Sequence, residues 1–143
     1  MSAARTTTLR FDAVSVGDEL PSLEVPITAT AIVAGALATR DFQDVHHDRD
    51  LAIARGSKDI FMNILTTNGY VGRFVSDWAG PDAMLHKIEI RLGAPNYPGD
   101  TMRMSGRVVE KRDGRVRVEL EGSNSLGNHV VGSVELWLPE GRA

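Results

Sequence analysis

The chain has 143 residues, 42% of them hydrophobic and 24% charged, with a formal net charge of −3 at pH 7. This length and composition predict one globular domain, residues 1–143, built around a single core. Lys and Arg are scattered along the chain and cysteine is absent, which argues against a nucleic-acid partner and excludes disulfides and thiolate chemistry.

The first segment, MSAARTTTLRFDAV, lacks the apolar core of a signal peptide, and no run approaches the roughly 18 apolar residues of a membrane span. We therefore expect a soluble, cytoplasmic protein with no membrane partner. Residues 1–28 predict extended chain, because apolar positions alternate in VGDEL and PSLEVPIT while Gly17, Pro21 and Pro26 prevent a helix.

Two short helices are predicted next. Residues 28–39, TATAIVAGALAT, are Ala-rich and apolar on most sides, which indicates a largely buried helix capped by Thr28 or Thr30. A second short helix is expected over residues 50–55, where Gly56 ends it.

A longer helix is predicted in NILTTNGYVGRFVSDWAG, where apolar residues recur at helical spacing until Gly80-Pro81 ends the pattern. Its expected apolar face comprises Ile64, Leu65, Tyr70, Val71, Phe74, Val75 and Trp78. We expect Phe74 and Trp78 to lie in the core, together with Trp137 near the end of the chain.

The last sixty or so residues alternate apolar and polar side chains in KIEIRLGAP, DTMRMSGRVVEK, RVRVELEGSNS and HVVGSVELWLP. Asp113-Gly114 and Gly127-Asn128 have the composition of hairpin turns. This pattern predicts a four-stranded antiparallel meander. One long helix combined with such a meander suggests an α+β hotdog fold, in which the antiparallel sheet wraps around a central helix.

Between the two short helices lies RDFQDVHHD, residues 40–48, which is rich in carboxylates and carries two histidines. As a solvated connection it would supply helix caps, and Asp48 and Asp50 suit that role. As a metal site it would use Asp44, His46, His47 and Asp48. Adjacent side chains do not converge easily on one ion, and no second His or carboxylate cluster completes a cage, so we expect no metal.

The third interpretation pairs Asp41 with His46 as an acid/base site. Fully extended, the five-residue spacing would hold the two residues roughly 16 Å apart, so a turn must bring their side chains together. A carboxylate and an imidazole have unperturbed pKa values of about 3.9 and 6.5. One can therefore be charged while the other exchanges a proton near neutrality, which suits activation of water.

The wider string ATRDFQDVHHDRDLA resembles the motif of the MaoC-like (R)-specific enoyl-CoA hydratases, which has an Asp, four residues, a His and a small residue six positions further on. These positions are Asp41, His46 and Ala52 here. With GSKDIFMNIL and DWAGP, the string is also similar to the small subunits of the actinobacterial hydratases that act on the steroid side chain. The resemblance implies hydration of a 2-enoyl-CoA thioester whose acyl group is bulky and derives from a steroid side chain.

The chain departs from the family pattern at two places. It has Gln43-Asp44 where the family usually has Asn-Pro, and Met62-Asn63-Ile64 where the family usually has His-Gly-Met at the start of the central helix. The family glycine holds the thioester oxygen through its backbone N–H. The resemblance therefore implies the backbone N–H of Asn63 as the oxyanion donor, at a helix N-terminus that favours negative charge.

The resemblance also implies a second MaoC-like hotdog subunit as partner, because paired hotdog domains enclose the CoA substrate. No cofactor is expected, since coenzyme A enters as part of the substrate. Two alternatives stay open at this point. One is a hotdog acyl-CoA thioesterase, whose acidic residue normally lies on the central helix, where this chain has Asn63, Asn68 and Asp77. The other is a non-catalytic hotdog partner or binding subunit.

Overall fold

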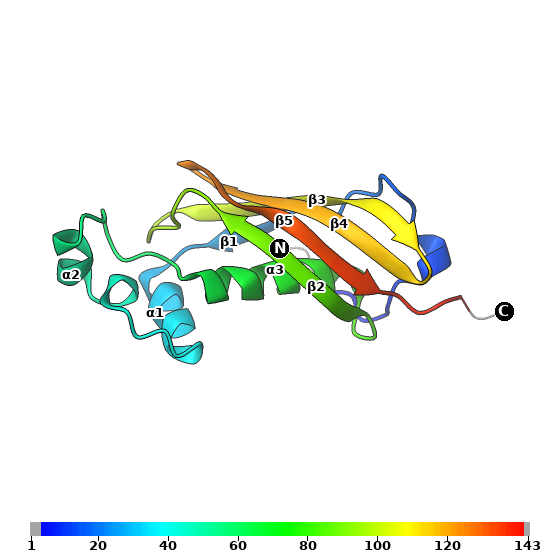
Figure 1. Cartoon of the computed structure of the whole chain (residues 1–143), viewed down its shortest axis with the longest axis horizontal. Helices are drawn as coiled ribbons and strands as arrows, with labels where there is room; N and C mark the ends of the chain where they lie inside the picture. The colour runs from blue at the N-terminus through cyan, green and yellow to red at the C-terminus, as the bar shows by residue number, and fades with distance from the viewer. Residues whose placement is uncertain (1–3, 142–143) are drawn as a thin grey trace.

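A five-stranded antiparallel sheet curves around the helix α3 in the computed structural model, which describes residues 4–141 (Figure 1). The strand order is β1-β3-β4-β5-β2. The strands are β1 (Leu23–Pro26), β2 (Met84–Leu92), β3 (Thr101–Arg112), β4 (Arg115–Asn124) and β5 (Gly127–Trp137). The helices are α1 (Ala29–Ala38), α2 (Arg49–Ala54) and α3 (Ile64–Ala79), with the short 3₁₀ segments η1 (Phe11–Ala13) and η2 (Asp44–His46). The predicted hotdog arrangement is confirmed.

The helix α3 begins and ends at the residues that favour these positions. Its N-cap is Asn63, whose side chain accepts a hydrogen bond from the backbone of Thr66, and its C-cap is Gly80, with φ 99°. Its buried side chains are Thr67, Val71, Phe74, Val75, Trp78 and Ala79. The predicted apolar face was wrong at its start, because Ile64 and Leu65 are 48% and 46% exposed.

The connection between β3 and β4 is the predicted turn, in which Asp113 and Gly114 both have positive φ, 51° and 78°. Two positive φ angles match the twist of the flanking strands in a tight hairpin. The second turn was predicted two residues too late. It lies between Asn124, the last residue of β4, and Gly127, which already belongs to β5 and pairs with Asn124.

The four C-terminal strands do not form a simple meander. The strands β3, β4 and β5 are neighbours in chain order, but β2 pairs antiparallel with β5 instead of β3. The chain therefore crosses from β2 at one edge of the sheet to β3, which lies beside β1 near the other edge. This correction leaves β2 as an edge strand with one free side.

The core fills the space between α3 and the inner face of the sheet. Phe74 and Trp78 are 2% and 7% exposed, as predicted. Trp137 was predicted to be buried as well, but it is 40% exposed at the end of β5. There its indole lies against Gly114 of the neighbouring hairpin, and an added Cβ on that glycine would come 3.0 Å from the indole nitrogen.

The segment from α1 through η2 to α2 lies at one end of the molecule, beyond the N-terminal end of α3 (Figure 1). Of the two candidates predicted for each cap, Thr28 caps α1 and Asp48 caps α2. Within residues 4–141, no helix is both long and apolar enough to cross a membrane. The acidic stretch between α1 and α2 is thereby placed next to the start of α3.

Candidate active site

The end of α1 determines where Asp41 lies. The backbone N–H of Asp41 donates to Ala36 at 2.9 Å, and the N–H of Arg40 donates to Leu37 at 3.1 Å. This pair of bonds is a Schellman motif, in which the residue after the cap adopts a left-handed conformation. Arg40 has that conformation, with φ 56°. The chain reverses at Arg40, and Asp41 follows directly after this reversal.

His46 is the last residue of η2 and is 6% exposed. Its Nδ1 atom lies 2.7 Å from the carbonyl oxygen of Phe61, and its ring contacts the Phe61 ring edge-on with centroids 5.0 Å apart. A carbonyl oxygen can only accept, so Nδ1 carries the hydrogen of this bond. This bond fixes the orientation of the imidazole ring. The other ring nitrogen, Nε2, therefore faces away from the Phe61 carbonyl.

The turn brings the two predicted side chains together. The Nε2 atom of His46 lies 3.3 Å from Oδ2 of Asp41, and the two side chains are 7% and 18% exposed. When His46 is protonated, Nε2 donates to the carboxylate. When it is neutral, Nε2 and the carboxylate both accept, and a water molecule that donates to both would satisfy them. The pair can therefore hold one proton, or bind one water, at a single point.

A third side chain completes the group. Asn63 is 2% exposed, and its Nδ2 atom donates to Oδ2 of Asp41 at 3.1 Å and to the hydroxyl of Thr39 at 2.9 Å. The Oδ1 atom of Asn63 accepts from the backbone N–H of Thr66 at 3.0 Å. The backbone N–H of Asn63 donates to no residue within the described part of the chain, 4–141.

These contacts shift the pKa of the Asp41 carboxyl. The hydrogen bond from Asn63 is the largest cause that holds the pKa of the Asp41 carboxyl below its ordinary value. Partial burial acts in the opposite direction, and the backbone N–H of Gln43 and the nearby His46 lower the pKa further. A carboxylate with a lowered pKa stays ionised at neutral pH and is available to accept a proton.

The other polar residues of the stretch have structural contacts. Asp44 is paired with Arg55 at 2.7 Å, and Asp48 accepts from the backbone N–H of Leu51 at 3.0 Å as the cap of α2. His47 is exposed. Among residues 4–141, no group of three or more His, Asp or Glu side chains is placed to hold a metal ion. Ala52, the small residue of the motif, is fully buried.

A second buried histidine supports the start of α3 from the sheet. The Nε2 atom of His129, on β5, lies 2.8 Å from the hydroxyl of Thr67, and its Nδ1 atom lies 2.7 Å from the carbonyl oxygen of Ala94. The Ala94 carbonyl requires a hydrogen on Nδ1, so Nε2 of the neutral ring accepts from Thr67. Burial lowers the pKa of His129, which favours this neutral form.

Exposed apolar side chains lie next in the chain to two members of this group. Phe42 is 63% exposed next to Asp41, and Ile64 and Leu65 are about half exposed next to Asn63. Exposed apolar side chains that gather in one place indicate a surface that another molecule covers. This exposure was not predicted, because the helical spacing placed Ile64 and Leu65 on the face expected to contact the core.

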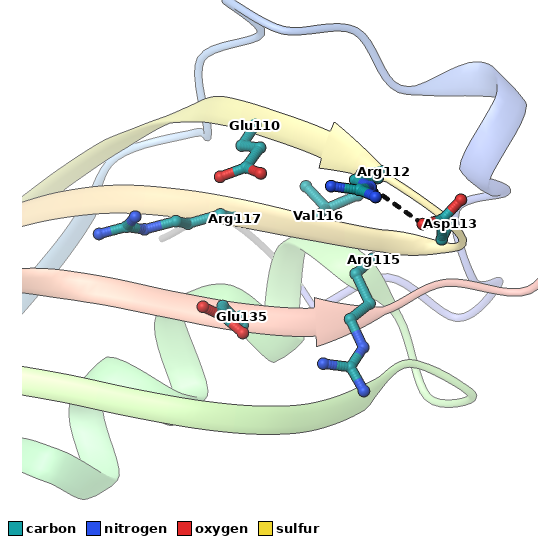
Figure 2. A pocket seen from close by; sticks show the side chains of 7 residues that line it. All are labelled: Glu110, Arg112, Asp113, Arg115, Val116, Arg117 and Glu135. Carbon is teal, nitrogen blue, oxygen red and sulfur yellow. Dashed lines mark hydrogen bonds and ion pairs between the residues drawn. The ribbon is translucent and has the colours of Figure 1, made fainter.

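A charged hollow lies on the sheet near the β3–β4 hairpin, away from Asp41 and His46 (Figure 2). Its lining includes Glu110, Arg117 and Glu135, which occupy paired positions on β3, β4 and β5. Opposite charges therefore face each other across adjacent strands, which stabilises a solvent-facing sheet surface. No histidine among the described residues lines this hollow, so it contains no carboxylate–imidazole pair like Asp41 and His46.

Sequence reasoning predicted that a turn brings Asp41 and His46 together, but it missed the groups that orient them. The carbonyl of Phe61 has no side-chain signal, and the hydroxyl of Thr39 lies 24 residues from its partner Asn63. The side chain of Asn63 had a usable signal, because an Asn directly before a helix is a common N-cap. Its contact with Asp41 depends on how α1 packs against α3, which no local pattern encodes.

The family described as MaoC like domain matches residues 12–129, a range that includes Asp41, His46 and Asn63. Over 121 residues, the chain is 56% identical to the 3-oxo-4,17-pregnadiene-20-carboxyl-CoA hydratase beta subunit of Mycobacterium tuberculosis. That alignment covers 85% of this chain and 94% of the relative.

Solved structures of other proteins are also similar to this chain. A chain in the crystal structure of the ChsH1-ChsH2 complex from Mycobacterium tuberculosis is similar with a TM-score of 0.85 and 55% identity, over 87% of this chain and 98% of that chain. The R-hydratase PhaJ1 from Pseudomonas aeruginosa is similar with a TM-score of 0.86 over 94% of this chain and 88% of that chain. At 21% identity, the second likeness concerns the fold alone.

Proposed function

Because the chain belongs to the MaoC-like domain family, we propose that it is the catalytic subunit of an enzyme that adds water to a 2-enoyl-CoA thioester. The observation that carries this proposal is the contact between Asp41 and His46, 3.3 Å apart and next in the chain to the exposed apolar side chain of Phe42. The relative with 56% identity is named as the beta subunit of a hydratase, which supports the same reaction.

In the proposed reaction, Asp41 accepts a proton from the attacking water while the water oxygen bonds to the β-carbon. His46 in its protonated form delivers the proton on Nε2 to the α-carbon, and the carbon–carbon double bond becomes a single bond. Proton transfer across the 3.3 Å contact then returns both side chains to their starting state. Positioned acids and bases of this kind typically contribute 10²–10⁴-fold to the rate.

The charge that develops on the thioester oxygen needs a donor. We propose the backbone N–H of Asn63 for this role, since it lies at the N-terminus of α3 and has no partner within residues 4–141. A helix N-terminus carries partial positive charge, and a preorganised donor to an oxyanion is worth about 3–4 kcal/mol.

We propose that the acyl group is bulky and derives from a steroid side chain. The relative from Mycobacterium tuberculosis is named for a pregnadiene carboxyl-CoA substrate. On this chain, the exposed side chains of Phe42, Ile64 and Leu65 provide apolar surface next to the acid/base pair. Such surface would be buried by a large apolar acyl group.

We also propose that a second, different hotdog subunit completes the site. The relative is named a beta subunit, and the solved structure of a similar chain is a complex of two kinds of subunit. The free side of the edge strand β2 provides unpaired backbone that a partner would cover. The partner would enclose the substrate beside Asp41 and His46.

Addition of water changes no oxidation state, so the proposed reaction needs no redox cofactor, and coenzyme A enters with the substrate. We expect activity to survive prolonged treatment with a chelator. A metal ion that copurifies in stoichiometric amount and whose removal abolishes turnover would contradict this expectation.

The function is tested by mixing the chain, alone and with a candidate hotdog partner, with crotonyl-CoA and separately with a steroid enoyl-CoA. Hydration removes the absorbance of the conjugated thioester without release of free thiol. Release of thiol would instead indicate a thioesterase, and no change with either substrate would indicate a binding subunit. Light scattering of the same samples shows whether the partner associates with the chain.

A further inference from the structure

We infer that the side-chain amide of Asn63 is a positioning residue for the catalytic carboxylate, separate from any role of its backbone N–H. The amide lies between three elements: the end of α1 at Thr39, the turn at Asp41 and the start of α3 at Thr66. This inference rests on the proposed hydratase function, which it deepens by assigning what orients the base.

The orientation of the Asn63 amide is fixed by its partners. The backbone N–H of Thr66 can only donate, so the atom that faces it at 3.0 Å is the carbonyl Oδ1. Nδ2 therefore faces Thr39 and Asp41. The Thr39 hydroxyl donates to the carbonyl of Gly35 at 2.8 Å and so accepts from Nδ2. Each hydrogen of Nδ2 thus has its own acceptor.

The two oxygens of Asp41 consequently differ. Both Nδ2 of Asn63 and Nε2 of His46 converge on Oδ2, at 3.1 and 3.3 Å. The other oxygen, Oδ1, has only a long contact of 3.4 Å with the backbone N–H of Gln43. The amide therefore holds Oδ2 against the imidazole and leaves Oδ1 as the oxygen with free capacity for a substrate water.

Capping alone does not require asparagine at this position. Ser, Thr and Asp cap helices about as well as Asn, because each offers an oxygen to the first-turn N–H groups. Of these residues, only Asn adds an N–H donor that can reach a neighbouring carboxylate. The close packing of α1 on α3 brings that carboxylate within reach, since an added Cβ at Gly35 would come 2.3 Å from the Thr66 hydroxyl.

The electrostatic effect agrees with this geometry. The hydrogen bond from Asn63 is the largest cause that lowers the pKa of Asp41, and His46 acts in the same direction. The other charged side chains on the adjoining turn are Arg40, which is exposed, and Asp44, which is paired with Arg55. Loss of the amide therefore leaves Asp41 with a pKa closer to its ordinary value.

The test compares two substitutions that keep the cap, measured in the complex with the partner subunit. In Asn63→Ser, we expect kcat to fall about ten- to a hundredfold, as for loss of a hydrogen bond to a charged group, while the unfolding midpoint stays near that of the wild type. The acidic limb of the kcat profile moves to higher pH. In Asn63→Asp, the added charge beside Asp41 moves the limb further in the same direction.

The same chemical change at the exposed Asn128, Asn128→Ser, is the control and leaves both the rate and the acidic limb unchanged. An Asn63→Ser enzyme with wild-type kcat and an unshifted acidic limb would overturn the inference. If the rate falls only in proportion to a loss of folded protein, the amide is a cap and nothing more, and the inference is wrong.

A measurement without substrate separates this inference from the proposed function. The Asp41 carboxyl is titrated by carbon NMR in the wild type and in Asn63→Ser, and we expect a higher pKa in the variant. If no enoyl-CoA is hydrated but this shift is found, the hydratase function fails and the positioning contact stands. If hydration is found without the shift, the reverse holds.

Discussion

His46 presents Nε2 to Oδ2 of Asp41 at 3.3 Å, while its Nδ1 atom is held 2.7 Å from the carbonyl of Phe61. The carboxylate and the imidazole have different proposed roles, so neither side chain can substitute for the loss of the other. We expect Asp41→Ala and His46→Ala each to lower kcat/KM for hydration by at least about a hundredfold. Circular dichroism should show that both variants remain folded.

His47 provides the matched control for this experiment. It is the neighbouring histidine, but it is exposed and lies outside the contact between Asp41 and His46. We expect His47→Ala to retain nearly the full rate of hydration. A large loss of rate in His47→Ala, with a mild effect of His46→Ala, would mean that the wrong histidine has been assigned.

The packing of α1 against α3 is expected to depend on Gly35. A Cβ at this position would come 2.3 Å from Oγ1 and 2.9 Å from Cγ2 of Thr66. Gly35→Ala should therefore lower the free energy of unfolding by about 1–3 kcal/mol, as other overpacking substitutions do. Denaturation in urea measures the change. Hydration should fall as well, because α1 carries Asp41 at its end.

Gly69 is the matched control for Gly35, since it also lies in a helix but has no atom within 4 Å of an added Cβ. Gly69→Ala should raise the free energy of unfolding of the isolated chain by about 0.5–1 kcal/mol, because Gly is unfavourable within helices. If both alanine variants stabilise the chain, α1 can move away from α3 without cost.

The buried His129 predicts how stability changes with pH. Burial holds its pKa below the ordinary value of 6.5, so the unfolded chain binds a proton more readily than the folded one. This contribution to stability is constant above about pH 6.5 and is lost as the pH falls toward the lower pKa of the folded state. Urea unfolding at several pH values measures the loss.

His129→Gln removes this titrating group, so its unfolding free energy should depend less on pH in the same range, although the variant is less stable at pH 8. The exposed His86 is the control, because His86→Gln should leave the wild-type pH dependence intact. A wild-type stability that does not change between pH 7 and pH 5 would show that His129 is not held in its neutral form.

Local signals in the sequence were sufficient to predict the three helices. Thr28 and Asp48 cap α1 and α2 as predicted, because capping depends on residues only three positions apart. The spacing of Asp41 and His46 likewise falls within one turn of chain. Resemblance to a known family, more than the spacing itself, distinguished this pair from a solvated turn.

Features that depend on distant segments were not predicted. The pairing of β2 with β5 is set by tertiary packing, and alternation in β2 fits either neighbour equally well. The contact between His129 and Thr67 joins residues 62 positions apart. Trp137 was assigned to the core by residue type, but its position at the end of the edge-proximal strand leaves it 40% exposed.

Arg40 occupies a position that normally favours glycine, directly before Asp41, the carboxylate proposed to be catalytic. Its φ of 56° lies in the left-handed region, which costs roughly 1–2 kcal/mol for an L-residue with a side chain. Glycine avoids that cost but loses about 0.5–1 kcal/mol of chain entropy on folding. We therefore expect Arg40→Gly to raise the free energy of unfolding by up to about 1 kcal/mol.

Arg40→Ala separates the backbone effect from the loss of charge, because alanine also lacks the guanidinium but keeps the cost of the left-handed conformation. In urea unfolding, the glycine variant should be more stable than the alanine variant, and the alanine variant should be no more stable than the wild type. Equal stability of the two variants would mean that Arg40 is not held at positive φ in solution. The Schellman bonds that place Asp41 after α1 would then need another explanation.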